Sequence, residues 1–138
     1  HELANHGMFD HPYNEFTYDD FKKDLELTDS ILINYTKDIP NFYRAPHAKF
    51  SNTMQKVIDE KGLTHFVCDA FANDTSIPDA KWISDYILTR VQPGSILLIH
   101  MPEKNIREWN YEAMELTLKG LKEKNYKVVT LSELYKLK

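Results

Sequence analysis

Apolar residues recur at the 3.6-residue spacing of amphipathic helices in four parts of the chain. Thr17, Ser51 and Asp79 stand where helix N-caps are needed, and Pro40 and Gly62 stand where the first two segments should end. The pattern predicts helices over 21–35, 54–58, 82–91 and 111–121, and a short last helix over 131–135.

Short apolar stretches between these helices predict strands over 42–44, 65–69, 95–100 and 127–130. The stretch 95–100 is nearly all apolar, as expected of a parallel strand that is covered on both faces. Alternating strands and helices predict an α/β fold with a parallel sheet, in which the chemistry lies beyond the carboxyl ends of the strands. Four polar side chains are expected there: Arg44, Asp69, Asp74 and His100.

Composition adds few constraints. The 138 residues fit one domain, with 42% hydrophobic residues and a net charge of −4. No basic patch stands out, so nucleic acid is not an expected partner. The apolar run Ile96–Ile99 is too short to cross a membrane. The single cysteine, Cys68, excludes an internal disulfide and is expected to be a buried, inert thiol.

The first twelve residues concentrate side chains that bind divalent metals. They include His6, Asp10 and His11, and imidazole and carboxylate are the usual ligands of zinc and similar ions. His6 and Asp10 are four residues apart, so they would share one face of a helical turn. A solvated, histidine-rich terminus would have the same composition, so the spacing alone leaves both interpretations open.

The four side chains at the strand ends also have two interpretations each. Arg44 is either a surface arginine or a residue that orients a catalytic carboxylate by a bidentate pair, with Asp69 as a possible partner. Asp74 could instead cap the turn that leads to Ile77. His100 is either a hydrogen-bonded core histidine or a catalytic group.

Five segments, taken in order, resemble the motifs of the polysaccharide deacetylases, also known as the chitooligosaccharide deacetylase family. A histidine-containing opening, an Arg-x-Pro segment, an aspartate, a Leu-x-His segment and a closing Tyr-Lys-Val-Val-Thr-Leu-Ser-Glu-Leu follow one another. They are residues 1–6, 42–47, Asp69, 97–100 and 126–134. The resemblance therefore runs over almost the whole chain.

The resemblance implies a distorted (β/α) barrel whose N-terminal strands are absent from this chain. The family's first motif, a Thr-Phe-Asp-Asp-like strand end, has no counterpart among residues 1–138 and would lie upstream of His1. We therefore expect residues 1–138 to be the C-terminal two thirds of a single deacetylase domain. A missing N-terminal segment, or a swapped copy of the chain, would pair with the exposed edge of the sheet.

The implied activity is removal of N-acetyl groups from an amino-sugar polysaccharide or oligosaccharide, with release of acetate. The implied cofactor is a divalent metal, with zinc favoured, bound by His6 and by either His11 or Asp10. The family places its two metal histidines four residues apart; here Asp10 occupies that place and His11 comes one residue later. The third ligand and the catalytic base would be the aspartates of the absent first motif.

The resemblance also assigns roles to the remaining residues. His100 would protonate the departing amine, Arg44 would hold the base aspartate, and Asp69 would orient Arg44. The backbone N–H of His47 would bind the oxyanion, and Leu98 would line the pocket for the acetyl methyl group.

Two alternatives remain from the sequence. The irregular metal motif also fits a catalytically inactive, carbohydrate-binding relative, and the chain also fits a fragment that needs an upstream segment for activity. The sequence does not name the glycan: chitin oligomers, peptidoglycan and other acylated amines all fit. Members of this family are commonly secreted or bound to the cell surface, which is the location that the resemblance favours.

Overall fold

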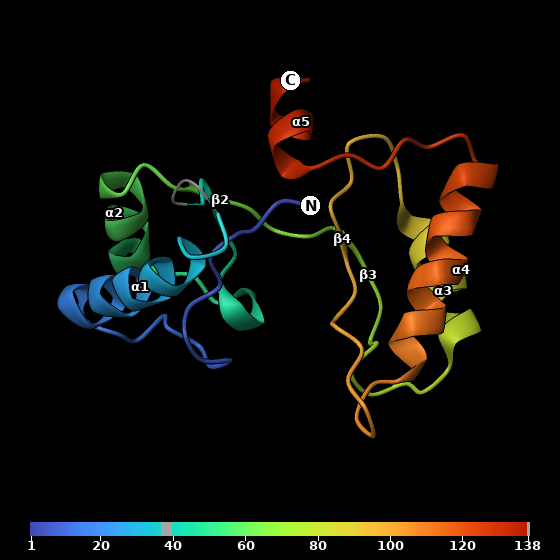
Figure 1. The fold of residues 1–138 in the computed structure, drawn as a ribbon, viewed down its shortest axis with the longest axis horizontal. Helices are drawn as coiled ribbons and strands as arrows, with labels where there is room; N and C mark the ends of the chain where they lie inside the picture. Colours follow the sequence, from blue (N-terminus) through green and yellow to red (C-terminus); the bar gives the residue numbers. More distant parts are fainter. Residues whose placement is uncertain (37–39, 138) are drawn as a thin grey trace. The chain divides into compact units, whose positions relative to one another are not determined.

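The computed structural model describes residues 1–36 and 40–137, and the chain divides into two compact units. The first unit is His1–Val67 and the second is Cys68–Lys138 (Figure 1). Each unit contains a two-stranded parallel sheet and two long helices, so each is described by itself.

In the first unit, helices α1 (Tyr18–Leu32) and α2 (Asn52–Glu60) begin at the predicted N-caps. The Thr17 hydroxyl accepts a hydrogen bond from the Asp20 N–H, and the Ser51 hydroxyl accepts one from the Met54 N–H. Strands β1 (Phe42–Tyr43) and β2 (Thr64–His65) pair in parallel. The short 3₁₀ turn η1 (Pro46–Ala48) follows β1.

The core of the first unit lies between its helices and β1. The helical periodicity predicted this core in part: Phe21 and Leu25 of α1 and the apolar face of α2 are buried in it, but Ile31 of α1 is 43% exposed. Its largest fully buried members are Tyr13, Phe21, Leu25, Tyr43, Met54, Val57 and Ile58.

In the second unit, strands β3 (Ala70–Phe71) and β4 (Leu97–Leu98) pair in parallel. Helices α3 (Ala80–Arg90) and α4 (Trp109–Glu123) pack together, and Ile83 and Ile87 of α3 are fully buried. The two helices approach closely at Gly120, where an added Cβ would lie 2.3 Å from Leu88 Cδ1. The short helix α5 (Leu131–Lys136) ends the described chain.

Alternation places the two faces of the β3–β4 sheet in different surroundings. Leu97 and Ile99 pack against the core that α3 and α4 share, and Ala70 lies within it. Side chains alternate across a strand, so Phe71 and Leu98, which are register partners, lie on the other face. Phe71 is 50% exposed there.

Four expected elements differ from the structure, and Cys68, expected to be a buried thiol, is only half-buried. Helix α1 ends at Leu32, short of Tyr35. The expected strand 65–69 is wrong, since β2 ends at His65 and β3 begins only after Asp69. The expected strand 95–100 is reduced to two half-buried residues, because nearby backbone groups bond to aspartate side chains instead of a longer ladder.

The fourth difference is at residues 127–130, which form no strand. Thr130 is instead the N-cap of α5, and its side chain and that of Glu133 form a reciprocal capping box. The stretch was predicted as a short apolar strand, but Val128 is 62% exposed, and the stretch pairs with no strand of the described chain.

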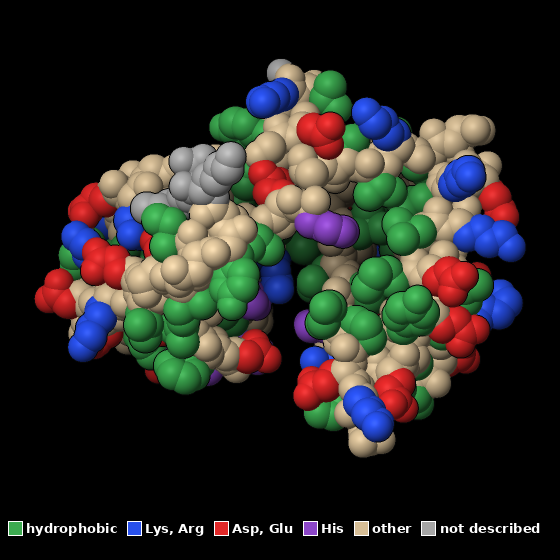
Figure 2. Space-filling model, viewed as in Figure 1, with side chains coloured by type: hydrophobic (Ala, Val, Ile, Leu, Met, Phe, Trp, Pro, Cys, Tyr) green, Lys and Arg blue, Asp and Glu red, His purple; other side chains and the backbone are tan. Residues whose placement is uncertain are grey.

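Several large apolar side chains stay exposed on each unit, and hydrophobic patches are visible on the surface in Figure 2. The exposed apolar side chains include Phe9 and Ile31 in the first unit and Met101 and Tyr111 in the second. Among the described helices, none is both long and apolar enough to cross a membrane.

Candidate active site

The segment before His6 is fixed by a buried polar network in the first unit. Asn5 is fully buried and forms a parallel bridge with Tyr43. Its Nδ2 donates to Asp29 Oδ1 at 2.7 Å, and Asp29 Oδ2 lies 3.0 Å from Lys61 Nζ. The backbone that enters the histidine-containing loop is therefore tied to both helices of the unit.

The turn after His6 requires glycine. Gly7 has a φ of 80°, and a Cβ there would lie 2.6 Å from the Tyr13 ring. Tyr13 is fully buried, and its hydroxyl accepts from the Phe9 N–H at 2.9 Å and donates to the Phe9 carbonyl at 3.1 Å. Burial raises the pKa of the Tyr13 hydroxyl, which is consistent with its role as a neutral anchor of the loop.

His6 is held in one tautomer by a backbone carbonyl. Its Nδ1 hydrogen-bonds the carbonyl oxygen of Arg44. Because a carbonyl oxygen only accepts, Nδ1 carries the proton, and the neutral ring has its lone pair on Nε2. Metal-binding histidines typically show this arrangement, with one ring nitrogen donating to a carbonyl and the other binding the ion.

His11 carries a buried nitrogen that lacks a partner. Its ring stacks on Phe9, with centroids 5.7 Å apart, and lies against Tyr13 and Phe16 at 4.6 and 5.3 Å. Within the described part of the chain, Nε2 has no hydrogen-bond partner. An orphaned buried nitrogen is costly, and a bound metal ion is one way to satisfy it.

Asp10 is placed differently, because its neighbour is His47. Asp10 Oδ1 lies 3.5 Å from His47 Nε2, and the Asp10 carbonyl lies 3.3 Å from the same nitrogen. The Asp10 side chain is 85% exposed. His47 and Ala48 both have left-handed backbone conformations, with φ of 55° and 54°. Strain of this kind at two consecutive non-glycine residues often marks a functional turn.

The donor chemistry of the first unit fits a metal in part. His6 has the tautomer that an imidazole ligand needs, and His11 has a buried Nε2 without a hydrogen-bond partner among the described residues. No group of three or more histidine, cysteine or acidic side chains positioned to hold a metal occurs among residues 1–36 and 40–137. A complete tetrahedral site needs at least one further protein ligand beyond these two imidazoles.

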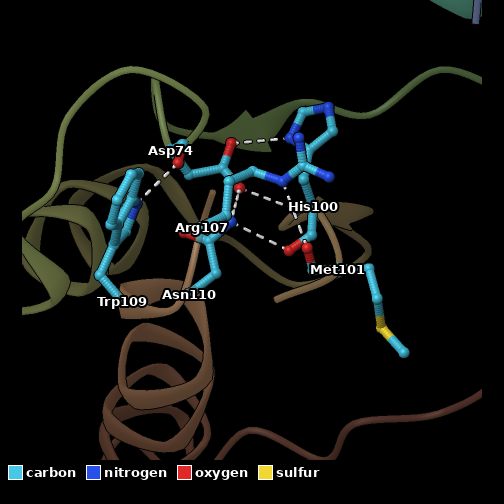
Figure 3. A network of polar contacts seen from close by, with 6 residues as sticks. All are labelled: Asp74, His100, Met101, Arg107, Trp109 and Asn110. Atoms are coloured by element: carbon cyan, nitrogen blue, oxygen red, sulfur yellow. Dashed lines mark hydrogen bonds and ion pairs between the residues drawn. The ribbon is translucent and has the colours of Figure 1, made fainter. Parts of the chain in front are cut away.

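The second unit contains the most developed polar network, and His100 and Asp74 are its centre (Figure 3). Asp74 Oδ1 lies 2.8 Å from His100 Nδ1, and Asp74 Oδ2 accepts from the His100 N–H at 2.6 Å. Both residues follow the carboxyl ends of the parallel strands β3 and β4. The sequence predicted this position correctly for both.

The first turn of α4 completes the network. Asn110 Nδ2 donates to Asp74 Oδ2 at 2.8 Å and to the His100 carbonyl at 2.9 Å. Trp109 Nε1 donates to the Asp74 carbonyl at 2.9 Å. Arg107 Nε donates to the Met101 carbonyl at 3.2 Å and supports the loop that follows the histidine (Figure 3).

Asp74 is an ionised carboxylate although only 1% of its side chain is exposed. Burial opposes its ionisation, but hydrogen bonds from the His100 side chain and backbone outweigh burial, so the pKa of Asp74 is lowered. An ionised carboxylate only accepts, so Nδ1 of His100 carries a proton and its Nε2 faces away from Asp74. The pair has the arrangement of a histidine oriented for proton transfer.

The position expected for Asp69 is wrong. Asp69 precedes β3, and its carboxylate accepts from Ser95 Oγ at 2.7 Å and from the Ile96 N–H at 2.6 Å. These partners precede β4, so Asp69 lies at the amino ends of the two strands, opposite to His100. Burial opposes ionisation here too, but the bonds from Ser95 and Ile96 leave the pKa of Asp69 lowered.

Sequence reasoning missed the contributions of Asn110 and Trp109. Both belong to the first turn of α4, and neither has a neighbour in the sequence that signals a bond to an aspartate 35 or 36 positions earlier. The need for a carboxylate partner of His100 follows from its chemistry, but the sequence did not identify that partner: Asp69 was paired with Arg44, and Asp74 was considered as a turn cap. Only the register of β3 against β4 decides between them.

Residues 1–66 match the family model described as polysaccharide deacetylase. The chain is 27% identical, over 99% of its length, to the bifunctional xylanase/deacetylase of Pseudobutyrivibrio xylanivorans. It is also 27% identical, with a TM-score of 0.88 over 99% of its length, to a family 4 acetyl xylan esterase from Clostridium thermocellum solved with a cobalt ion.

The chain is therefore similar to the polysaccharide deacetylases over residues 1–66, and to proteins of this kind over nearly its whole length. Its predicted α/β fold of this family's type is confirmed by the structural matches. A family 4 pseudoenzyme from Bacillus anthracis shares the fold, at 22% identity and a TM-score of 0.86. The chain covers 22% of the xylanase/deacetylase, 65% of the acetyl xylan esterase and 46% of the pseudoenzyme.

Proposed function

We propose that this chain belongs to the deacetylase family and to a metal-dependent hydrolase that removes acetyl groups from an N-acetylated amino-sugar glycan and releases acetate. The observation that carries the proposal is the His100–Asp74 pair. A buried, ionised carboxylate fixes the ring through Nδ1 and directs Nε2 away from itself. A histidine held in this way serves proton transfer better than packing, because a core histidine needs no ionised partner.

His100 is proposed as the general acid. An amide nitrogen leaves only when it is protonated, and His100, held through Nδ1 by the Asp74 carboxylate, would deliver that proton from Nε2. Leu98 is the last residue of β4, two residues before His100, and lies on the face of the β3–β4 sheet opposite to the core that α3 and α4 share. This placement suits the proposed role of Leu98 beside the acetyl methyl group.

His6 and His11 are proposed as two ligands of the divalent metal, with zinc favoured. When bound, the ion would polarise the acyl carbonyl and lower the pKa of a bound water. The Nδ1–H of His6 donates to the Arg44 carbonyl, which makes Nε2 the coordinating atom. His11 is preferred over Asp10 as the second ligand, because its Nε2 is buried without a partner among the described residues while Asp10 lies beside His47.

We further propose that residues 1–138 are the C-terminal two thirds of one deacetylase domain, whose first motif contributes the base aspartate and a metal-ligand aspartate. Arg44 would then hold the base. The expected role of Asp69 beside Arg44 finds no support within its own unit, where its carboxylate is bound by Ser95 and Ile96. The backbone N–H of His47 remains the candidate for the oxyanion.

The proposal is tested by measuring acetate release from N-acetylglucosamine oligomers, with the full-length protein supplied with zinc or cobalt. His100→Asn should lower kcat by about 10²–10⁴-fold while the melting temperature changes little. The matched control is Asn125→Asp, at an exposed turn in the same unit. A folded His100→Asn variant that turns over at the wild-type rate would remove His100 from catalysis.

A second candidate substrate is an acetyl ester on xylan. Two relatives at 27% identity support it: a bifunctional xylanase/deacetylase and an acetyl xylan esterase. The same acid, His100, would protonate a departing sugar alkoxide. Acetate release from acetylated xylan but not from N-acetylglucosamine oligomers would establish the ester as substrate. Glycan binding without acetate release from either would instead support the inactive, carbohydrate-binding alternative.

A further inference from the structure

We propose that Asn110, in the first turn of α4, is a positioning residue that fixes the His100–Asp74 pair. The inference rests on the proposed function for its kinetic consequence, but its structural part stands on the network in Figure 3. Asn110 does not itself face the reacting groups: it acts through the two residues that it binds.

One amide group of Asn110 binds both members of the pair. Its Nδ2 donates to the Asp74 carboxylate at 2.8 Å and to the His100 carbonyl at 2.9 Å. Both partners are acceptors, so the nitrogen and oxygen of the amide can be arranged in only one way. Asn110 therefore fixes the distance between the carboxylate and the histidine backbone, and with it the direction in which the ring points.

Helix α4 supplies the rigidity that this task needs. Asn110 is fully buried, and the preceding residue, Trp109, donates from Nε1 to the Asp74 carbonyl at 2.9 Å. Asp74 is thus bound by two consecutive residues of a 15-residue helix, near its positive end, where a carboxylate is favoured. The loops that carry Asp74 and His100 are held against one rigid element.

Packing alone does not account for an amide at this position. Asn110 Oδ1 is buried and has no hydrogen-bond partner within the described residues, which is a cost that an apolar side chain of similar size would avoid. The two bonds that Nδ2 donates are what distinguishes asparagine from leucine here. Both bonds go to the pair itself, one to Asp74 and one to His100.

The test compares Asn110→Leu, which removes both donors, with Asn110→Ser, which keeps a single shorter donor. Thr117→Val is the matched control, because Thr117 lies on the same helix, is 2% exposed, and donates to the Ala113 carbonyl of its own helix. The ¹⁵N and ¹H signals of the His100 ring report the Nδ1–H···Asp74 bond. Acetate release from the full-length, metal-supplied protein gives kcat and KM.

For Asn110→Leu we expect the single Nδ1–H signal to be lost or broadened and kcat to fall by about 10–100-fold, as for other residues that orient a catalytic group indirectly, with KM nearly constant. Asn110→Ser should be intermediate and Thr117→Val unchanged. A wild-type ring signal in Asn110→Leu, or in Asn110→Ser if the leucine variant does not fold, overturns the proposal. If the wild-type protein releases no acetate, the proposed function fails, and the ring signal still decides the role of Asn110.

Discussion

Replacing Asp74 by asparagine should reverse the tautomer of His100. The carboxylate receives three hydrogen bonds: from the His100 N–H at 2.6 Å, from Asn110 Nδ2 at 2.8 Å and from His100 Nδ1 at 2.8 Å. An asparagine of the same shape has one oxygen and one NH₂. The amide oxygen is best placed at the position of Oδ2, where it still accepts from the His100 N–H and from Asn110 Nδ2. An NH₂ group at that position would face two donors.

The NH₂ group of the introduced amide would then face Nδ1 of His100, and two donors cannot bond to each other. In Asp74→Asn the ring proton should therefore move to Nε2, with Nδ1 as acceptor. All three hydrogen bonds remain in the variant but lose the charge of their acceptor, and one reverses its direction, which together cost about 1.5–3 kcal/mol of stability. Catalysis should fall further, by about 10⁴-fold in kcat, the loss measured when the aspartate of a serine-protease triad is replaced in the same way.

The assay has two parts. The ¹⁵N shifts of the His100 ring identify which nitrogen is protonated, and acetate release gives kcat. Asp79→Asn is the control for the same chemical change, since Asp79 caps α3 by accepting from the Trp82 N–H and asparagine caps equally well. A folded Asp74→Asn protein with Nδ1 still protonated, or with kcat within about twofold of wild type, would refute the reasoning.

Acid stability, the glycine turn and the metal ligands can each be tested as well. The pKa of Asp74 is lowered in the folded protein, so the ionised carboxylate stabilises the fold above the unfolded pKa of about 4. This stabilisation is lost as the pH falls through the lowered pKa. The free energy of unfolding, measured as the pH is lowered, should fall in that range, and the fall should be smaller in Asp74→Asn. Gly7→Ala should lower the free energy of unfolding by about 2–5 kcal/mol, because Gly7 has a positive φ and the new Cβ would lie 2.6 Å from the Tyr13 ring. Gly62→Ala should lower it by only about 1–2 kcal/mol, because Gly62 has a positive φ but open space around it. Equal losses of stability in the two variants would contradict the predicted clash with Tyr13. His6→Ala and His11→Ala should each weaken zinc binding about tenfold or more in calorimetric titration, and an unchanged affinity for His11→Ala would assign the second ligand to Asp10.

Local sequence signals predicted the helices well, because most begin at a side chain that caps them and bury a periodic apolar face. Thr17, Ser51 and Asp79 are N-caps in the structure as in the prediction. The strands were predicted less well, because strand length depends on partners that are distant in sequence. Asp69 shows the consequence: its bonds to Ser95 and Ile96 place it before β3, and no local pattern contains that information.

The candidate site could be predicted only as far as its chemistry. A histidine after an apolar strand needs an ionised partner to act as an acid, which the sequence can state. Which carboxylate lies beside His100 depends on the register that pairs Ala70 with Leu97, because this register places Asp69 beside Ser95 and Asp74 beside His100. The same is true of His6, whose tautomer depends on a carbonyl 38 residues away that β1 brings beside it.

His6 and His100 are each oriented by contacts within their own unit. His6 donates through Nδ1 to the Arg44 carbonyl, which is uncharged, so in the neutral ring the lone pair that a cation needs is on Nε2. His100 donates through Nδ1 to Asp74, which is ionised, so the ring is fixed by a charge-assisted hydrogen bond and Nε2 is the atom left for proton transfer. The same ring, bound through the same atom, is thereby prepared for opposite tasks by the charge of its acceptor. Removing that charge, as in Asp74→Asn, should therefore abolish proton donation by His100 while leaving metal binding through His6 unchanged.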